Sequence, residues 1–294
     1  MTALTPLSVS YRGITFDKAG PYYLQEVDGL FGAPDFILDD VPRAGGHGSL
    51  LTPQRRGVRL VTLSGVCLDK ATRDQLFWDL RTAMAPTVNP LRTDEVTVTT
   101  AGVILSGYAQ PPKFQPTQEL GKWSRGLWTF AVQWRMPDPY LYGPSMRQVI
   151  EFSLPPTGIT YPVTYPVTYP EHPPQGSTII YNAGTAPAAA RYALAGPWVL
   201  PGLVNVTTGK RVQYGFDLAL GDELVIDTAQ GASFLNGEYR TPTATSDLTS
   251  DLAILPGNCT LQALGQGPSW DDLFSLDSPS DGVAVSVAFR PAYW

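Results

Sequence analysis

The segment LPPTGITYPVTYPVTYPEHPPQ, residues 154–175, divides the 294-residue chain into a front and a back part. It contains seven prolines, which exclude a helix or a central β-strand because proline lacks a backbone N–H and fixes φ. A Tyr-Pro-Val-Thr unit repeats within it. In an extended chain Tyr161, Val163, Tyr165, Val167 and Tyr169 share one face, because side chains alternate with a period of two. We therefore interpret residues 154–175 as an extended arm with one apolar face.

Two roles for this arm follow from its composition. A proline-rich segment can serve as a stiff spacer with incidental tyrosines. Its apolar face can also dock against its own domain or against a neighbouring subunit. The second interpretation makes the five alternating Tyr and Val side chains of the arm candidate assembly contacts.

The charge of the chain is unevenly distributed. Residues 1–175 carry 15 basic and 15 acidic side chains, whereas residues 176–294 carry 5 basic and 11 acidic ones, which accounts for the whole net charge of −6. An acidic back part argues against binding of nucleic acid or of an anionic membrane. The chain also has no apolar run of the ~20 residues that span a bilayer, and no signal peptide is expected at its start. We therefore expect a protein made in a cytoplasm, without specific nucleic-acid binding or membrane insertion.

The front part, residues 1–153, combines strands with a single helix. GVRLVTLSGVCL, residues 57–68, has the composition of a strand, and an apolar stripe predicts a helix over residues 70–84 with Asp69 as its N-cap. A long glycine-containing loop, residues 39–54, precedes the strand, and such loops are commonly functional or mobile. Near residue 130, Trp128, Phe130 and Trp134 alternate with polar residues, and we count these three aromatic residues among the candidate assembly contacts. The pattern predicts an α+β domain, either a β-barrel or a sandwich, with one helix.

The back part, residues 176–294, has only strand signals. Short β-rich runs alternate with turn signals such as Gly221-Asp222 and Asn236-Gly237, the second of which strongly favours a hairpin. This spacing predicts an antiparallel β-sandwich and no helix. The whole chain is thus expected to be mainly β.

The residues that usually carry chemistry do not form recognisable motifs. There is no phosphate-binding glycine loop, and a catalytic triad could use only His47 or His172, neither of which has a serine in a suitable setting. Cys67 and Cys259 are too sparse for a disulfide framework, and no metal-ligand spacing occurs. Acidic pairs such as Asp222-Glu223 and Asp271-Asp272 occur, but Asp222 has the position of a turn residue after Gly221. We expect no enzyme, no cofactor and no metal.

Several segments, taken in order, carry a resemblance to a known family. In the front part they are VDGLFG (residues 27–32), the glycine loop with the following strand and helix, and FAVQWRMPDPYLYG (residues 130–143). In the back part they are YNAGTAPAAARYALAGP, NVTTGKRVQY, LALGDELVIDT, FLNG, LPGN and the final VAFRPAYW. With these segments the chain resembles the distal tail proteins (Dit) of bacteriophages with long, non-contractile tails.

The resemblance implies a structural virion protein at the tail tip. Residues 1–153 would be a tail-tube-like domain that forms a ring, expected to be hexameric, and residues 176–294 would be a galectin-like β-sandwich. The arm falls where the family joins its two domains. Expected partners are further copies of the chain, the tail tube protein, the tail-tip hub or tail-associated protein, and the tape measure protein.

Two other functions stay open. The chain lacks the large insertion in the back sandwich that host-binding members of the family carry. This absence weakens the hypothesis that the protein binds a host receptor directly. A carbohydrate-binding module for attachment to the host surface is the alternative, because Trp198, Tyr214, Tyr239 and Trp270 could stack on sugars. The third hypothesis, a hydrolase that acts on the cell wall, is supported only by the acidic pairs.

Overall fold

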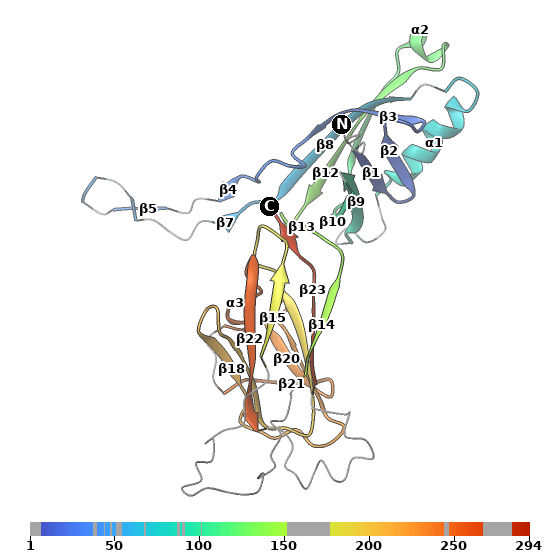
Figure 1. Ribbon diagram of the computed structural model, residues 1–294. Coiled ribbons are helices and arrows are strands. Elements are labelled where there is room, and N and C mark those ends of the chain that lie inside the picture. The colour runs from blue at the N-terminus through green and yellow to red at the C-terminus, as the bar shows by residue number, and fades with distance from the viewer. Residues whose placement is uncertain are drawn as a thin grey trace, which may run out of the picture. The chain divides into compact units, whose positions relative to one another are not determined.

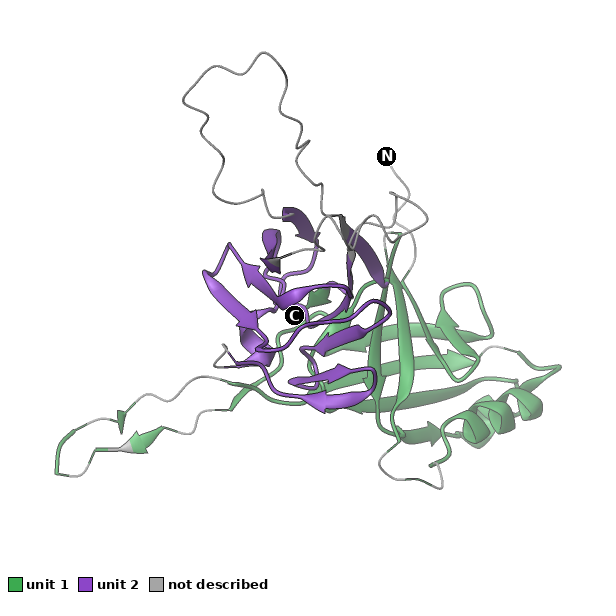
Figure 2. Ribbon diagram, turned by 90° about the horizontal axis from the view of Figure 1, so that it is seen from below, with its two compact units in different colours: residues 1–144, 292–294 green, residues 145–291 purple. Residues whose placement is uncertain are grey.

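The computed structural model describes residues 7–37, 40–43, 45–47, 49–50, 55–67, 69–86, 89, 92–100, 102–151, 177–243, 247–266 and 284–294. The chain forms two compact units (Figure 2). Unit 1 comprises Met1–Pro144 and Ala292–Trp294, and unit 2 comprises Ser145–Pro291. The arm, with the five candidate contacts in it, lies outside the described residues.

Unit 1 is built on one ten-stranded sheet. Its strands, in sheet order, are β11 (Lys113–Thr117), β12 (Trp128–Met136), β8 (Arg59–Cys67), β3 (Tyr22–Asp28), β2 (Ile14–Asp17), β1 (Ser8–Tyr11), β9 (Asp94–Thr100), β10 (Val103–Ala109), β13 (Leu141–Tyr142) and β24 (Ala292–Tyr293). All neighbours are antiparallel except the parallel pair β2 and β3. Within the described residues the two edge strands, β11 and β24, do not pair with each other. Of the two expected architectures, the closed barrel is therefore not formed.

The core of unit 1 is aromatic. Trp128, Phe130 and Trp134 are at most 3% exposed, and Phe16 packs within 6.0 Å of the rings of Phe130 and Trp134. The helix α1 (Arg73–Ala83) adds Phe77, whose ring lies 5.4 Å from that of Trp128. The predicted helix was three residues too long at its start, because Asp69 caps a preceding turn through the amides of Ala71 and Thr72. A one-turn helix, α2 (Leu120–Trp123), lies where sequence analysis predicts no helix.

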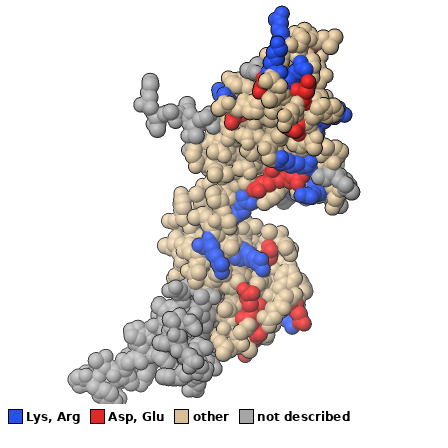
Figure 3. Space-filling view, turned by 90° about the vertical axis from the view of Figure 1, so that its right-hand side faces the viewer, with Lys and Arg blue, Asp and Glu red and all other residues tan. Residues whose placement is uncertain are grey.

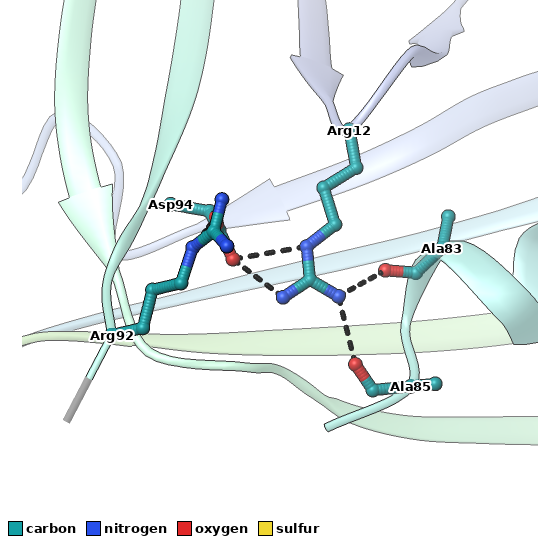
Figure 4. A network of polar contacts seen from close by, with 5 residues as sticks. All are labelled: Arg12, Ala83, Ala85, Arg92 and Asp94. Carbon is teal, nitrogen blue, oxygen red and sulfur yellow. Dashed lines mark hydrogen bonds and ion pairs between the residues drawn. The ribbon is translucent and has the colours of Figure 1, made fainter. Parts of the chain in front are cut away.

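A polar network fastens the end of α1 to the sheet (Figure 4). The Arg12 guanidinium donates through Nη1 to the carbonyl oxygens of Ala83 and Ala85, at 3.0 and 2.7 Å. Its Nε and Nη2 donate to Asp94 of β9, and the exposed Arg92 donates to the same carboxylate. A cation at the carbonyl end of a helix satisfies acceptors that have no partner within the helix.

Unit 2 is a two-sheet sandwich, as predicted. The larger sheet holds, in order, β14 (Met146–Glu151), β23 (Ala284–Phe289), β16 (Ala190–Ala195), β19 (Glu223–Asp227), β20 (Ala232–Leu235) and β21 (Glu238–Arg240). The smaller sheet holds β15 (Ser177–Asn182), β22 (Gly257–Gln266), β17 (Val199–Asn205) and β18 (Lys210–Gln213). Asn236 and Gly237 form the expected hairpin turn, both with positive φ. Sequence analysis predicts no helix here, but Asp247 caps a single turn, α3 (Leu248–Asp251), through the amide of Thr249.

Each unit contains a strand from a part of the chain that sequence analysis assigns to the other unit. The strand β14, which sequence analysis assigns to the front part, pairs with β23 in unit 2. The last strand, β24, pairs with β13 in unit 1. The first boundary in the structure is therefore at Ser145, upstream of the arm, and the chain returns to unit 1 at Ala292.

Candidate functional site: the long hairpin of unit 1

Between β3 and β8 the chain leaves the sheet as a protruding ribbon, here called the long hairpin, whose described residues lie within the range 33–57 (Figures 1 and 2). Near the sheet, β4 (Phe36–Ile37) pairs with β7 (Arg55–Arg56). Further out, β5 (Val41–Pro42) pairs with β6 (Ser49–Leu50). Among the described residues these two pairs of strands form two-stranded sheets with no third strand beside them.

The long hairpin exposes large apolar side chains. Phe36 is 50%, Ile37 46%, Val41 54% and Leu50 56% exposed. An isolated two-stranded ribbon is at best marginally stable in water, and clustered exposed apolar residues mark interaction surfaces. The two edges of a ribbon also offer backbone groups for pairing with another chain. The long hairpin thus has the features of a segment that binds a partner surface.

The root of the long hairpin is held by a buried cation. Arg59, at the start of β8, is 1% exposed and donates through Nε to the carbonyl oxygen of Pro139 at 2.8 Å. Its Nη1 donates to the carbonyl oxygens of Leu30 and Gly32 at 2.7 and 2.8 Å. Burial, with a smaller contribution from nearby Arg56, lowers the pKa of Arg59. One side chain therefore ties together the segments VDGLFG and MPDPYLYG, which lie far apart in the sequence.

A second arginine fixes the first strand of the long hairpin. The Arg56 guanidinium lies 3.8 Å from the ring centroid of Phe36 and donates to the carbonyl oxygen of Pro34 at 3.0 Å. Gly29 precedes it in the chain with φ of 74°, where a Cβ would clash with the carbonyl oxygen of Leu60. The root also borders a cavity of about 530 Å³ between residues 28–37 and 57–60. The long hairpin is thus anchored at its base and projects from a fixed point.

The Dit protein of phage SPP1, described as a paradigm of the hub adsorption apparatus in phages that infect Gram-positive bacteria, matches 98% of this chain and 99% of its own length. The TM-score is 0.61 and the sequence identity 14%. The chain has the Dit fold.

Two further matches are weaker. Structures of the phage P2 baseplate in its activated conformation, with Ca and with Sr, give TM-scores of 0.43 and 0.44 at 9% and 10% identity, over 97% of both chains. No protein-family model matches the chain, and no curated protein does either. The assignment of the Dit fold rests on the SPP1 protein.

The structure corrects one set of predicted site residues. Trp128, Phe130 and Trp134 belong to the core of unit 1, so their alternation reflects packing and their side chains are not at the surface for assembly contacts.

The candidate sugar-binding residues and the acidic turn residue Asp222 differ in their surroundings. Of the four aromatic residues expected of a sugar-binding module, Trp198 and Tyr214 are buried, Tyr239 is 61% exposed, and Trp270 lies outside the described residues. Asp222 accepts from the Asn236 side chain and from the amide of Ala219, which lowers the pKa of Asp222 and gives it the role of a turn residue.

In the part of the chain that the structure describes, no three His, Cys, Asp or Glu side chains are grouped to hold a metal ion. No helix within that part has the length and hydropathy to cross a membrane. Cys67 and Cys259 are both buried, in different units.

Sequence reasoning missed the exposed apolar residues of the long hairpin. The loop that it singled out, residues 39–54, contains the strands β5 and β6 of the long hairpin, but it was noted for its glycines. The available signal was the set of apolar residues on both sides of those glycines, Phe36, Ile37, Val41 and Leu50, which match neither helical nor strand periodicity.

Proposed function

We propose that this protein is a structural component of a phage tail tip, where it forms a ring that joins the tail tube to the tail-tip hub. The observation that carries the proposal is the Dit fold over nearly the full chain, combined with a long hairpin whose large apolar side chains are about half exposed. The role is one of assembly rather than catalysis.

The long hairpin is the proposed contact between neighbouring copies. It projects from one side of unit 1, and we place its partner surface on another molecule. A contact between two different surfaces of identical subunits propagates from copy to copy and closes into a ring when the rotation allows it. We expect six copies, as the family resemblance implies.

The proposed location fixes the other partners. Besides further copies of itself, the ring would contact the tail tube protein, the hub or tail-associated protein, and the tape measure protein, all in the virion after synthesis in the host cytoplasm. The arm remains a proposed second contact. Replacing Tyr161, Tyr165 and Tyr169 by serine is expected to weaken association, since each tyrosine would lose the burial of apolar area.

The proposal is tested by the mass of the purified full chain in solution. Light scattering is expected to give a closed oligomer for the wild type, whereas the triple variant Phe36→Ser, Val41→Ser, Leu50→Ser is expected to be a monomer. The change removes apolar area without touching the core, so circular dichroism should stay unchanged.

A matched control removes equally exposed apolar residues elsewhere. Leu120, Val206 and Leu220 are 88%, 48% and 63% exposed and lie outside the long hairpin. Their triple replacement by serine is expected to leave the oligomer intact. A wild-type monomer at all concentrations, or equal loss of the oligomer in both triple variants, would contradict the proposal.

A further inference from the structure

The outer face of the larger sheet of unit 2 carries a shallow polar groove. One cross-strand row consists of Arg147, Ala288 and Arg191, on the adjacent strands β14, β23 and β16. The next row on the same face places Ser286 beside Ala193. The groove has a volume of about 240 Å³ and is lined by Arg147, Arg191, Ala193, Glu223, Ser286 and Ala288.

The two arginines are spaced to hold one anionic group between them. They are two strands apart, which places their backbones about 10 Å from each other, and only the methyl group of Ala288 stands between them. Figure 3 looks onto the side of unit 2 that carries β14 and shows basic side chains close together there. Long arginine side chains on both sides of a small residue can converge on a carboxylate or a phosphate, which they bind with paired hydrogen bonds.

Neither arginine is neutralised within the described part of the chain. No ion pair or hydrogen bond of either guanidinium is formed there. Asp227 stands opposite Arg191 in the register, but its Oδ1 accepts from the amides of Ala229 and Gln230 at 2.9 and 3.1 Å. In a unit where acidic residues outnumber basic ones, two unpaired arginines beside one groove are a specific feature of this face.

The remaining groups on this face suit a sugar. Glu223 lines the groove with a carboxylate that can accept from hydroxyl groups. Two strands further along the same face, Phe234 and Tyr239 stand opposite each other with ring centroids 6.2 Å apart, and Tyr239 is 61% exposed. An exposed aromatic ring offers a flat surface for stacking.

We infer that the outer face of the larger sheet binds an acidic saccharide. Its carboxylate or phosphate lies between Arg147 and Arg191, a hydroxyl donates to Glu223, and a further sugar ring stacks on Tyr239. A volume of 240 Å³ is below the range of typical small-molecule pockets, so it suits one charged group of a longer ligand. The inference does not depend on ring formation.

Two other polyanionic ligands fit the face less well. A nucleic acid would meet the net negative charge of the unit at long range. An acidic peptide could pair with the two arginines. However, the alanine and serine side chains that form the floor of the groove offer no apolar pocket for the side chains of a peptide. The hydroxyl acceptor and the exposed aromatic ring favour the saccharide.

The test is isothermal titration calorimetry of the full chain with defined probes. Trigalacturonate supplies carboxylates, glucose 6-phosphate supplies a phosphate, and maltotriose is the neutral reference. At least one acidic probe is expected to bind at least tenfold more tightly than maltotriose, and which of the two does so identifies the acidic group. Raised salt is expected to weaken this binding.

Three variants locate the site. Arg147→Gln with Arg191→Gln is expected to weaken binding at least tenfold, and Ala288→Met is expected to weaken it by filling the floor without a change of charge. Arg211→Gln, an exposed arginine on the smaller sheet, is the control and is expected to bind as the wild type does. The inference is overturned if no acidic probe binds, if maltotriose binds as tightly, if hexa-aspartate binds more tightly than both acidic sugars, or if the double arginine variant is unaffected.

Discussion

At the scale of residues, Arg59 explains why three separated segments meet at the root of the long hairpin. Its buried guanidinium satisfies the carbonyl oxygens of Leu30, Gly32 and Pro139, which would otherwise lack donors. A buried cation surrounded by carbonyl groups, without a carboxylate among its hydrogen-bond partners, cannot be inferred from sequence spacing. For that reason, sequence analysis assigns no structural role to Arg59.

Replacing this cation tests its structural role. Arg59→Met keeps the length of the side chain but leaves several carbonyl oxygens unsatisfied, and the lost desolvation cost of the charge offsets only part of this. We expect the free energy of unfolding in urea to fall by about 2 kcal/mol. The exposed control Arg211→Met should change it by less than about 0.5 kcal/mol. Equal midpoints for the two variants would show that Arg59 does not hold the root.

The Arg12 network gives a second residue-scale prediction with an internal control. Arg12 and Arg92 both donate to Asp94, but the Arg12 side chain is 21% exposed and the Arg92 side chain 65%. Arg12→Met also leaves the carbonyl oxygens of Ala83 and Ala85 without their donor. We expect Arg12→Met to lower the free energy of unfolding by about 2 kcal/mol and Arg92→Met by less than about 1 kcal/mol. The reverse order in urea unfolding would contradict this account of the network.

At the scale of elements, local sequence patterns predicted the features that depend on interactions within a few residues. The alternation in β12, the apolar stripe of α1 and the Asn236-Gly237 turn are all present in the structure, because burial and turn chemistry act over a few residues. The long hairpin escaped prediction because its strands are two residues long and have no buried face. The one-turn helices α2 and α3 are likewise too short for a periodic signal.

Local sequence patterns also did not predict which distant strands pair with each other. Met146 of β14 stands opposite Phe289 of β23, and no local pattern specifies that register. In addition, Gln148 of β14 donates to the Thr178 hydroxyl and to the carbonyl oxygen of Ile179, which links the two sheets of the sandwich. The strand β14 is therefore an integral part of unit 2.

This assignment predicts how unit 2 behaves as a fragment. A fragment of residues 145–291 contains β14, whereas one of residues 176–291 leaves the edge of β23 uncovered. We expect the longer fragment to melt at a higher temperature by several degrees and to stay monomeric, because it keeps the six residue pairs between β14 and β23. Thermal unfolding followed by circular dichroism checks this. Equal melting temperatures would mean that β14 contributes nothing to the stability of the sandwich.

At the scale of the whole molecule, unit 2 is an insertion in unit 1. The chain leaves unit 1 after Pro144 and returns at Ala292, where β24 completes the sheet beside β13. A single proteolytic cut within residues 154–175 therefore falls inside unit 2, between β14 and β15. The two products are expected to stay associated through the pairing of β14 with β23, and not to separate as two independent domains.

The central claim is that the long hairpin of each copy binds its neighbour in a closed ring. Electron cryomicroscopy of the assembled full-length protein tests it most directly, because a reconstruction shows both the number of copies and the surface under each hairpin. The account predicts a closed ring, with six copies, in which Phe36, Val41 and Leu50 of one subunit are covered by unit 1 of the next. Copies that meet through other surfaces while the hairpins extend into solvent would contradict it.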